Sequence, residues 1–135
     1  MATAKTTKEQ YGIRREIGLP FQDALSRTRE ALKNEGFGVL TEIDMKAKLK
    51  EKLDKDFREY VILGACNPGF AYEALEHDIE IGLLLPCNVI VFEGDDGTVV
   101  SAIDPEKAMS IAGDPAIEPV AQQVGAKLRT AIDSI

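Results

Sequence analysis

The stretch from Tyr60 to Glu93 constrains the fold more than any other part of the chain, because it contains two apolar strands separated by a helix. Tyr60 to Cys66 is apolar on both faces, as expected of a central strand that is covered on each side. Cys87 to Glu93 is a further strand, and Gly94-Asp-Asp-Gly97 predicts a tight connection to a strand over Thr98 to Ile103. These last two strands should be antiparallel neighbours in a sheet.

Strand and helix periodicities also alternate before this stretch. Apolar residues at alternate positions predict a strand from Tyr11 to Ile17, and three- and four-residue spacing predicts a helix from Pro20 to Gly36. Phe37 to Ile43 alternates again and predicts a second strand. Asp44 can cap a short helix over Met45 to Leu53, whose apolar stripe is too narrow for deep burial.

The remaining helices are predicted to begin at three prolines, Pro68, Pro105 and Pro119. The order of elements predicts an α+β fold, built as a single-domain two-layer sandwich in which helices pack on a mixed sheet of about five strands. Residues 1–9 are expected to form a loose or disordered tail. Residues 10–135 are expected to form a single domain, since the chain contains no linker or repeat that divides it.

The charge and apolar content of the chain narrow the classes of partner. The formal net charge of −7 repels nucleic-acid phosphates and anionic lipids, so neither nucleic acid nor a membrane is expected as a partner. The longest apolar run, Ile79 to Ile90, is far shorter than the ~20 residues that span a bilayer. Because the N-terminus is polar and resembles no signal peptide, we expect a cytoplasmic protein with its cysteines reduced.

The two cysteines, Cys66 and Cys87, are the candidate catalytic residues. They lie in near-mirrored settings, Ala-Cys-Asn-Pro and Pro-Cys-Asn, where each strand meets the intervening segment. A thiol just before a helix N-terminus is favoured as the thiolate, the nucleophilic and metal-binding form, and Cys66 occupies such a position. The alternative is that both cysteines only pack as small buried hydrophobic residues.

The relative direction of the two strands decides whether the thiols meet. If the strands are parallel neighbours, Cys66 and Cys87 lie at opposite ends of the sheet, about 20 Å apart, and share no ligand within one chain. If the strands are antiparallel, both thiols lie at the same end of the sheet. The sequence leaves both arrangements open.

The sequence argues against several other kinds of catalytic or binding site. His77, the only histidine, lies nine residues after Pro68, about 13 Å along a straight helix, so it cannot activate Cys66. The same distance argues against a zinc site made of His77 and both cysteines. The sequence contains no phosphate-loop, dinucleotide-binding or Gly-x-Ser-x-Gly pattern.

Two segments carry distinctive surfaces. Lys46, Lys48, Lys50 and Lys52 form a basic cluster that is either an anion-binding rim or, as is more common, a solvated helix face. The apolar segment from Ile79 to Leu85 is predicted to form a subunit interface with some core burial. Such an interface should be twofold, the commonest symmetry of homodimers.

Three motifs occur together at specific spacing: Gly64-Ala-Cys-Asn-Pro68, Ile81-Gly-Leu-Leu-Leu-Pro-Cys-Asn-Val89, and Asp104-Pro105 followed by the Met109 helix. With them the chain resembles the family known as domain of unknown function 302, small bacterial and archaeal proteins, from about Tyr11 to the C-terminus. The resemblance implies an α+β sandwich, usually a homodimer, with no settled activity. It also marks Cys66, Asn67, Pro86, Cys87 and Asn88, of which Asn67, Pro86 and Asn88 become candidate ligand-binding residues.

Three functions remain consistent with these features. The first is a cytoplasmic homodimeric module that binds a small molecule or metal ion near Cys66 and Cys87. The second is a thiol-based redox protein or enzyme in which Cys66 is the nucleophile and Cys87 is the resolving thiol. The third is an interaction protein whose cysteines only pack. The sequence identifies no cofactor.

Overall fold

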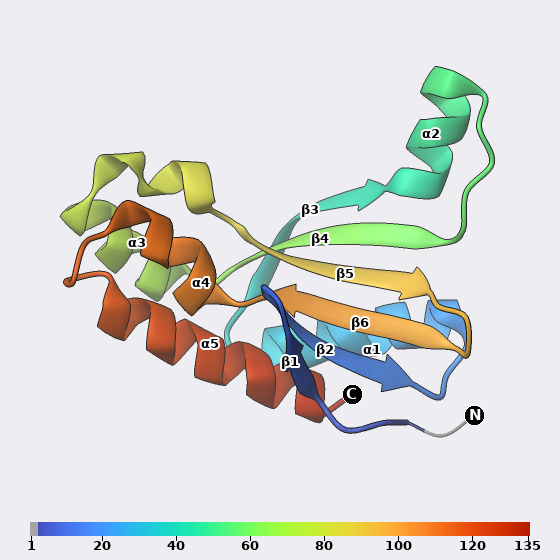
Figure 1. The fold of residues 1–135 in the computed structure, drawn as a ribbon, viewed down its shortest axis with the longest axis horizontal. Helices are drawn as coiled ribbons and strands as arrows, with labels where there is room; N and C mark the ends of the chain where they lie inside the picture. Colours follow the sequence, from blue (N-terminus) through green and yellow to red (C-terminus); the bar gives the residue numbers. More distant parts are fainter. Residues whose placement is uncertain (1–2) are drawn as a thin grey trace.

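The computed structural model describes residues 3–135, which form one sheet flanked by helices (Figure 1). The sheet has six strands in the order β1-β2-β6-β5-β4-β3, so the predicted α+β fold is confirmed. The strands are β1 (Thr7–Glu9), β2 (Gly12–Ile17), β3 (Gly38–Asp44), β4 (Tyr60–Cys66), β5 (Cys87–Glu93) and β6 (Thr98–Ile103). The helices are α1 (Phe21–Asn34), α2 (Met45–Leu53), α3 (Pro68–His77), α4 (Pro105–Met109) and α5 (Glu118–Asp133), with short 3-10 helices η1 (Ile79–Leu84) and η2 (Ser110–Ala112).

Each pair of neighbouring strands within residues 3–135 is antiparallel. The prediction of a mixed sheet is therefore wrong, whereas the predicted hairpin of β5 and β6 is confirmed, with Glu93 paired to Thr98. The difference arises between β4 and β5. There α3 and η1 do not carry the chain across the sheet but return it to the end at which β4 finishes, so β5 runs back alongside β4.

The sixth strand, β1, lies in the segment that was expected to be a loose tail. Thr7 to Glu9 pair with Arg14 to Gly12 of β2, and the Ala4 N–H donates to the Glu16 carbonyl at 2.9 Å. For residues 7–9 the expectation of a loose tail is wrong, because an edge strand offers unpaired backbone groups to any segment that reaches it. Residues 1 and 2 lie outside the described part of the chain. That residues 10–135 form a single domain stays a prediction.

The core lies between one face of the sheet and the helices α1 and α5. Val61, Leu63 and Ala65 of β4 are buried on this face, because alternate residues of a strand point to the same side. The two covering helices bury stripes of residues with helical spacing, namely Ala24, Leu25, Thr28, Ala31 and Leu32 in α1 and Val120, Ala121, Val124, Leu128, Ala131 and Ile132 in α5.

No helix of residues 3–135 is both long and apolar enough to cross a membrane.

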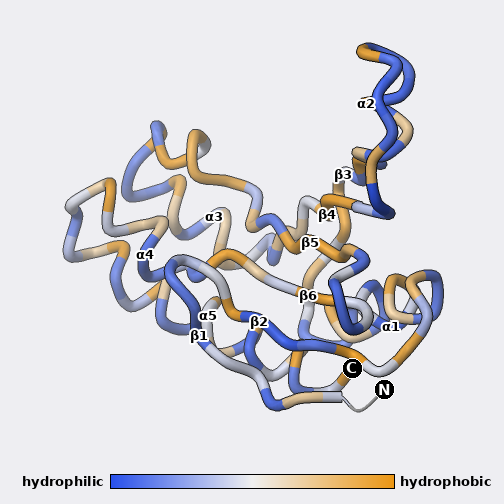
Figure 2. Tube along the Cα trace, turned by 45° about the vertical axis from the view of Figure 1, so that its right-hand side comes forward, coloured by the Kyte–Doolittle hydropathy of each residue, from blue (hydrophilic) through white to orange (hydrophobic). Residues whose placement is uncertain are grey.

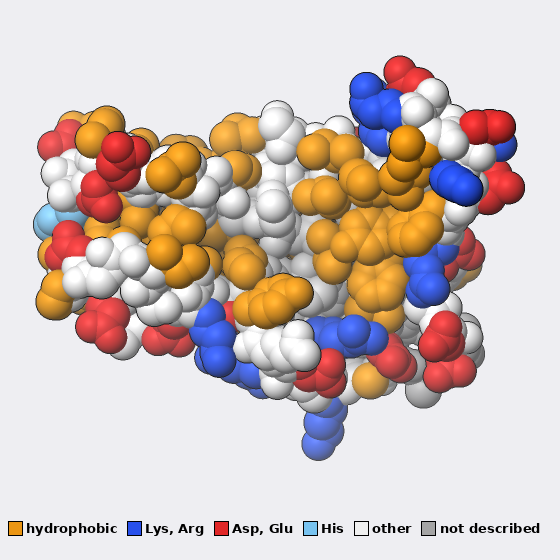
Figure 3. All heavy atoms as spheres, turned by 45° about the horizontal axis from the view of Figure 1, so that its top comes forward, with side chains coloured by type: hydrophobic (Ala, Val, Ile, Leu, Met, Phe, Trp, Pro, Cys, Tyr) orange, Lys and Arg blue, Asp and Glu red, His pale blue; other side chains and the backbone are white. Residues whose placement is uncertain are grey.

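The other side of the central strands is an apolar surface that we call the open face. It is formed by Tyr60 and Ile62 of β4, Ile90 and Phe92 of β5, and Ile43 of β3, which are half-buried or exposed. The Tyr60 and Phe92 rings stack with their centroids 5.4 Å apart. Figure 3 shows a hydrophobic patch in this part of the surface, beside α2.

A β-bulge decides which residues of β3 contribute to the open face. The register with β4 shifts between Val39 and Thr41, so that Val39 pairs with Ala65 whereas Ile43 pairs with Ile62. The regular alternation predicted for Phe37 to Ile43 is therefore interrupted, because a bulge adds one residue to one strand only.

Helix α2 projects from the sheet beyond β3 and β4 (Figure 1) and is mostly hydrophilic (Figure 2). It has no buried residues, which agrees with its narrow apolar stripe. Its lysines form surface ion pairs, including Lys46 with Glu59 at 3.0 Å and Lys50 with Asp54 at 3.0 Å. This pairing favours the solvated-face interpretation of the basic cluster over an anion-binding rim.

Arg15 of β2 ties the N-terminal edge of the sheet to the end of α5. Its Nη1 donates to the carbonyls of Ile132 at 2.9 Å, Asp133 at 2.9 Å and Ile135 at 3.3 Å. Its Nε donates to the Ala4 carbonyl at 2.8 Å. A guanidinium at a helix C-terminus pairs with carbonyls that lack helical partners and with the negative end of the helix dipole.

We expect Arg15→Ala to lower the free energy of unfolding by about 1–2 kcal/mol, since carbonyls at the α5 terminus lose a charged donor. Arg15→Lys should recover part of this loss, because the charge remains while the planar fork is lost. Arg129→Ala, at an exposed position of α5, is the matched control and should change stability by less than about 0.5 kcal/mol. Urea unfolding measures all three, and an Arg15→Ala protein as stable as the native one contradicts this role.

Candidate functional site

The antiparallel pairing of β4 and β5 brings both cysteines to one end of the sheet. Ala65 of β4 pairs with Cys87 of β5, so Cys66 follows one position beyond this pair. The structure thus selects the antiparallel alternative that the sequence left open. Diagonal neighbours of this kind lie about 6 Å apart at Cα, given a strand spacing of ~4.8 Å and a rise of ~3.3 Å per residue.

The chain turns sharply into a helix directly after Cys66. Asn67 holds the N-cap position of α3, Pro68 occupies the first turn, and the Ala71 N–H donates to the Asn67 carbonyl at 2.9 Å. The Asn67 side chain forms no capping hydrogen bond to this helix. Instead, Asn67 Nδ2 donates to the Glu35 carbonyl at 3.5 Å, close to the positive-φ Gly36.

A small apolar pocket lies where these elements meet, and Cys66, Asn67 and Cys87 all line it. Its volume is about 20 Å³, which is enough for one particle of the size of a water molecule. The pocket is also lined by side chains from five other parts of the chain. The larger ones are Phe37, Phe70, Leu85, Met109, Val120 and Val124.

Both cysteines are free thiols in an apolar setting. Cys87 is only 5% exposed, and burial together with the neighbouring Cys66 raises the pKa of its thiol to about 11. Burial also raises the pKa of the half-buried Cys66 thiol. Burial of Cys66 thus opposes the stabilisation of the thiolate that is expected from the α3 N-terminus, because desolvation disfavours the charged form.

The other two candidate ligand-binding residues lie elsewhere. Pro86 and Asn88 line a separate hollow together with Leu83, Leu84 and Ile103. Pro86 follows a cis peptide bond and packs over Gly64, where an added Cβ would approach Pro86 Cγ to 3.0 Å. The pocket thus gathers Cys66, Asn67 and Cys87 but not Pro86 or Asn88, whose part in ligand binding stays a prediction.

Met109 and Val120 are site residues that sequence reasoning missed. They lie more than twenty residues beyond Cys87, in α4 and α5, and the packing of these two helices on each other brings them to the pocket. Their helical spacing predicts only that they face a core. Local sequence carries no signal that this core borders two thiols.

His77 is exposed and lies at the C-terminal end of α3. Within residues 3–135, no group of three or more histidine, cysteine, aspartate or glutamate side chains is arranged to hold a metal ion. A metal at this pocket would therefore need ligands of another type besides the two cysteines.

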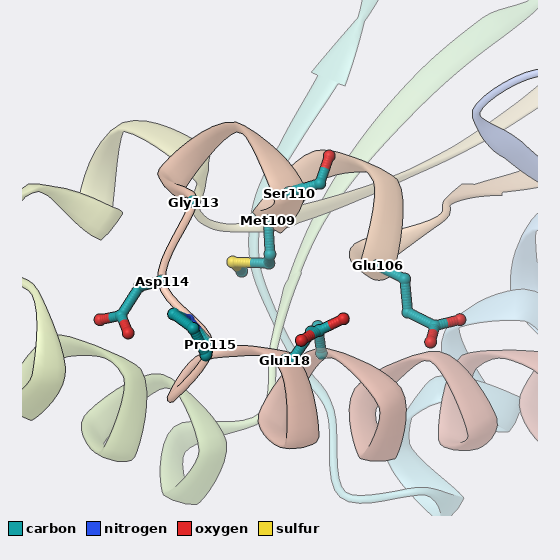
Figure 4. A pocket seen from close by; sticks show the side chains of 8 residues that line it. Glu106, Met109, Ser110, Gly113, Asp114, Pro115 and Glu118 are labelled. Carbon is teal, nitrogen blue, oxygen red and sulfur yellow. The ribbon is translucent and has the colours of Figure 1, made fainter.

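A second, larger hollow adjoins the thiol pocket and shares Met109 and Ala121 with it. Its volume is about 290 Å³, and Glu106, Asp114 and Glu118 line it (Figure 4). In Figure 4 the Met109 side chain is directed from α4 towards α5, where Glu118 lies. Met109 and Ala121 thus form the wall between the two hollows.

Comparisons with known proteins found one matching family and a similar solved structure. The model of a family described as Domain of unknown function DUF302 matches residues 13–135. The chain is also similar to the crystal structure of an uncharacterized conserved protein DUF302 from Bacillus stearothermophilus, with a TM-score of 0.87 and 29% identity. That similarity covers 93% of this chain and 98% of the other. No curated protein matches.

The raised pKa values predict slow thiol chemistry at neutral pH. Only the thiolate attacks a chromogenic disulfide reagent, so the rate at Cys66 should be low at pH 7 and keep rising with pH beyond 9. Cys87 should react only after the protein unfolds, because it is buried and its pKa is about 11. The Cys66→Ser and Cys87→Ser variants assign each reaction to its thiol. A fast reaction of either native thiol below pH 7 contradicts this prediction.

Proposed function

Because the chain belongs to the DUF302 family, a family of unknown function, we propose its function from its own site: a module that binds a small ligand or metal ion at Cys66 and Cys87. The observation that carries this proposal is the convergence of both thiols on one pocket from the ends of adjacent strands. A cytoplasmic location, in which the thiols stay reduced, is part of the proposal.

The size of the pocket favours an ion over an organic molecule. Sites for organic ligands commonly measure roughly 300–1,000 Å³, whereas this pocket measures about 20 Å³. A single ion fits such a space without moving Phe37 or Phe70, and thiolates are strong ligands for several metals.

A thiol-based redox function, with Cys66 as nucleophile and Cys87 as resolving thiol, is the second candidate. The closeness of the two cysteines on adjacent strands favours it, because their Cα separation of about 6 Å lies within the range of disulfides. The raised pKa of both thiols weighs against it, since a nucleophile needs the thiolate. Regular strand alternation directs neighbouring positions to opposite faces, which disfavours a direct sulfur–sulfur bond, whereas the pocket at the ends of the two strands is lined by both Cys66 and Cys87.

The proposal includes a homodimer in which a second copy covers the open face. A single chain then supplies one layer of sheet and one layer of helices, the expected two-layer sandwich, and the partner covers Ile43, Tyr60, Ile62, Ile90 and Phe92. The segment Ile79 to Leu85 offers less apolar surface for this purpose. There Ile79 and Leu83 are 82% and 83% exposed, but Ile81 is buried and Leu85 packs against the core.

Charge supports a second copy as the partner of the open face. The segment from Met45 to Arg58, around α2, contains six basic and three acidic side chains, and three of its lysines form surface ion pairs within the chain. The segment from Pro68 to Pro86, around α3 and η1, contains four acidic side chains and no lysine or arginine. These segments lie at opposite ends of the molecule (Figure 1). A twofold, antiparallel pairing of two open faces would place each basic end near the partner's acidic end.

The binding proposal predicts that reduced protein takes up Zn(II) or Cd(II) at one ion per chain and that the bound ion slows modification of Cys66. Cys66→Ser and Cys87→Ser should each weaken binding, because each removes a thiolate ligand. His77→Ala is the matched control and should bind as well as the native protein. Isothermal titration and thiol-reaction rates measure these effects. The proposal fails if neither these ions nor Cu(I) protect Cys66, or if His77→Ala abolishes uptake.

The dimer proposal predicts a dimer mass for the native protein in light scattering after gel filtration. Ile43→Glu, at a position that is 40% exposed, should raise the dimer dissociation constant roughly thirtyfold or more, as loss of a central interface contact of about 2 kcal/mol does. Leu83→Glu is the matched control and should stay dimeric. A monomeric native protein, or a dimer that Leu83→Glu disrupts and Ile43→Glu does not, contradicts the assignment.

A further inference from the structure

The thiol pocket is lined by three residues that contain sulfur. Besides Cys66 and Cys87, Met109 of α4 lines the pocket and is only 7% exposed. The chain has two cysteines and three methionines in total, and three of these five residues line the pocket. Each comes from a separate segment, namely the end of β4, the start of β5 and the end of α4.

The other side chains that line the pocket offer few oxygen or nitrogen ligands for a hard metal ion. Its larger walls are the apolar side chains of Phe37, Phe70 and Val124, and Asn67 is the one amide. Calcium and magnesium require several oxygen ligands or bound waters, which this space of about 20 Å³ does not provide. Zinc in structural sites takes four nitrogen or sulfur ligands, one more than the three sulfurs here, so we expect zinc to bind less tightly than an ion that needs fewer ligands.

We propose that the pocket binds one soft monovalent ion, Cu(I), through Cys66, Cys87 and Met109. Thiolate and thioether sulfur are the ligands that select Cu(I), and this ion accepts fewer ligands than zinc does. The inference rests on the proposed function, because it takes the thiol pocket to be the binding site, and it adds the identity of the ion and the third ligand.

The neighbouring acidic hollow supports this assignment. Glu106, Asp114 and Glu118 line it, and Met109 forms part of the wall that it shares with the thiol pocket. A cleft lined by carboxylates raises the local concentration of cations. The Met109 side chain lies beside this hollow (Figure 4), and Met109 also lines the thiol pocket, so a cation in the hollow would lie beside a residue that both spaces share.

The test is an anaerobic titration of the reduced full-length chain with Cu(I), in competition with a chromogenic Cu(I) chelator. The native protein should remove one Cu(I) per chain from the chelator and develop a thiolate-to-copper absorption band. Cys66→Ser and Cys87→Ser should lose this band or reduce it. Met109→Leu keeps the side-chain volume but not the sulfur, and should weaken binding roughly ten- to a hundredfold, the range seen when a supporting group of a metal site is lost.

Met45→Leu is the matched control, because Met45 lies on the projecting helix α2, away from the pocket, and its loss should leave Cu(I) affinity unchanged. X-ray absorption at the copper edge provides a readout that a merely structural role would not move. The number of sulfur neighbours around copper should fall from three in the native protein to two in Met109→Leu. Near-ultraviolet circular dichroism checks that each variant is folded.

The outcomes separate this inference from the proposed function. If the chelator keeps all the Cu(I) while Zn(II) or Cd(II) still protects Cys66, the soft-ion inference is wrong and the binding module stands. If Met109→Leu binds Cu(I) as tightly as the native protein and with the same sulfur count, the three-sulfur site is wrong. If none of the three ions protects Cys66, both proposals are wrong.

Discussion

The antiparallel register of β4 and β5 is the constraint on which the rest of the structure depends. Pairing Ala65 with Cys87 places the buried alternate residues of both strands under α1 and α5, and it brings Cys66 and Cys87 to the same end of the sheet. A shift of one residue would turn every side chain of a strand to the opposite face. The register therefore sets both the core and the thiol pocket, and neither can change without the other.

The two thiols of the candidate site lie in apolar surroundings. Cys87 is almost fully buried among apolar side chains, so its thiol is held in the neutral form, with a pKa of about 11. A neutral thiol costs little to bury, which explains how the fold tolerates it. Near neutral pH, a metal ion bound at this thiol would favour the thiolate, because its positive charge would replace the proton.

Much of the fold was predictable because its signals are local. Gly36 ends α1 with a positive φ, Asp44 accepts a hydrogen bond from the Ala47 N–H at the start of α2, and the Gly94 to Gly97 connection joins β5 to β6, all as expected. The bulge in β3 and the edge strand β1 were missed. Both depend on a neighbouring strand rather than on their own residues, so no periodicity within Phe37 to Ile43 or Thr7 to Glu9 reports them.

The sequence alone determined the order of the helices and of strands β2 to β6, the family, and the choice of Cys66 and Cys87 as candidate site residues, since each of these depends on short stretches of neighbouring residues. Only the tertiary structure decided that the sheet is antiparallel throughout residues 3–135, that the two thiols share a pocket without Pro86 or Asn88, and that Met109 joins them. The physical reason is that strand direction and helix packing are settled by contacts between segments far apart in the chain, where local propensity has no influence.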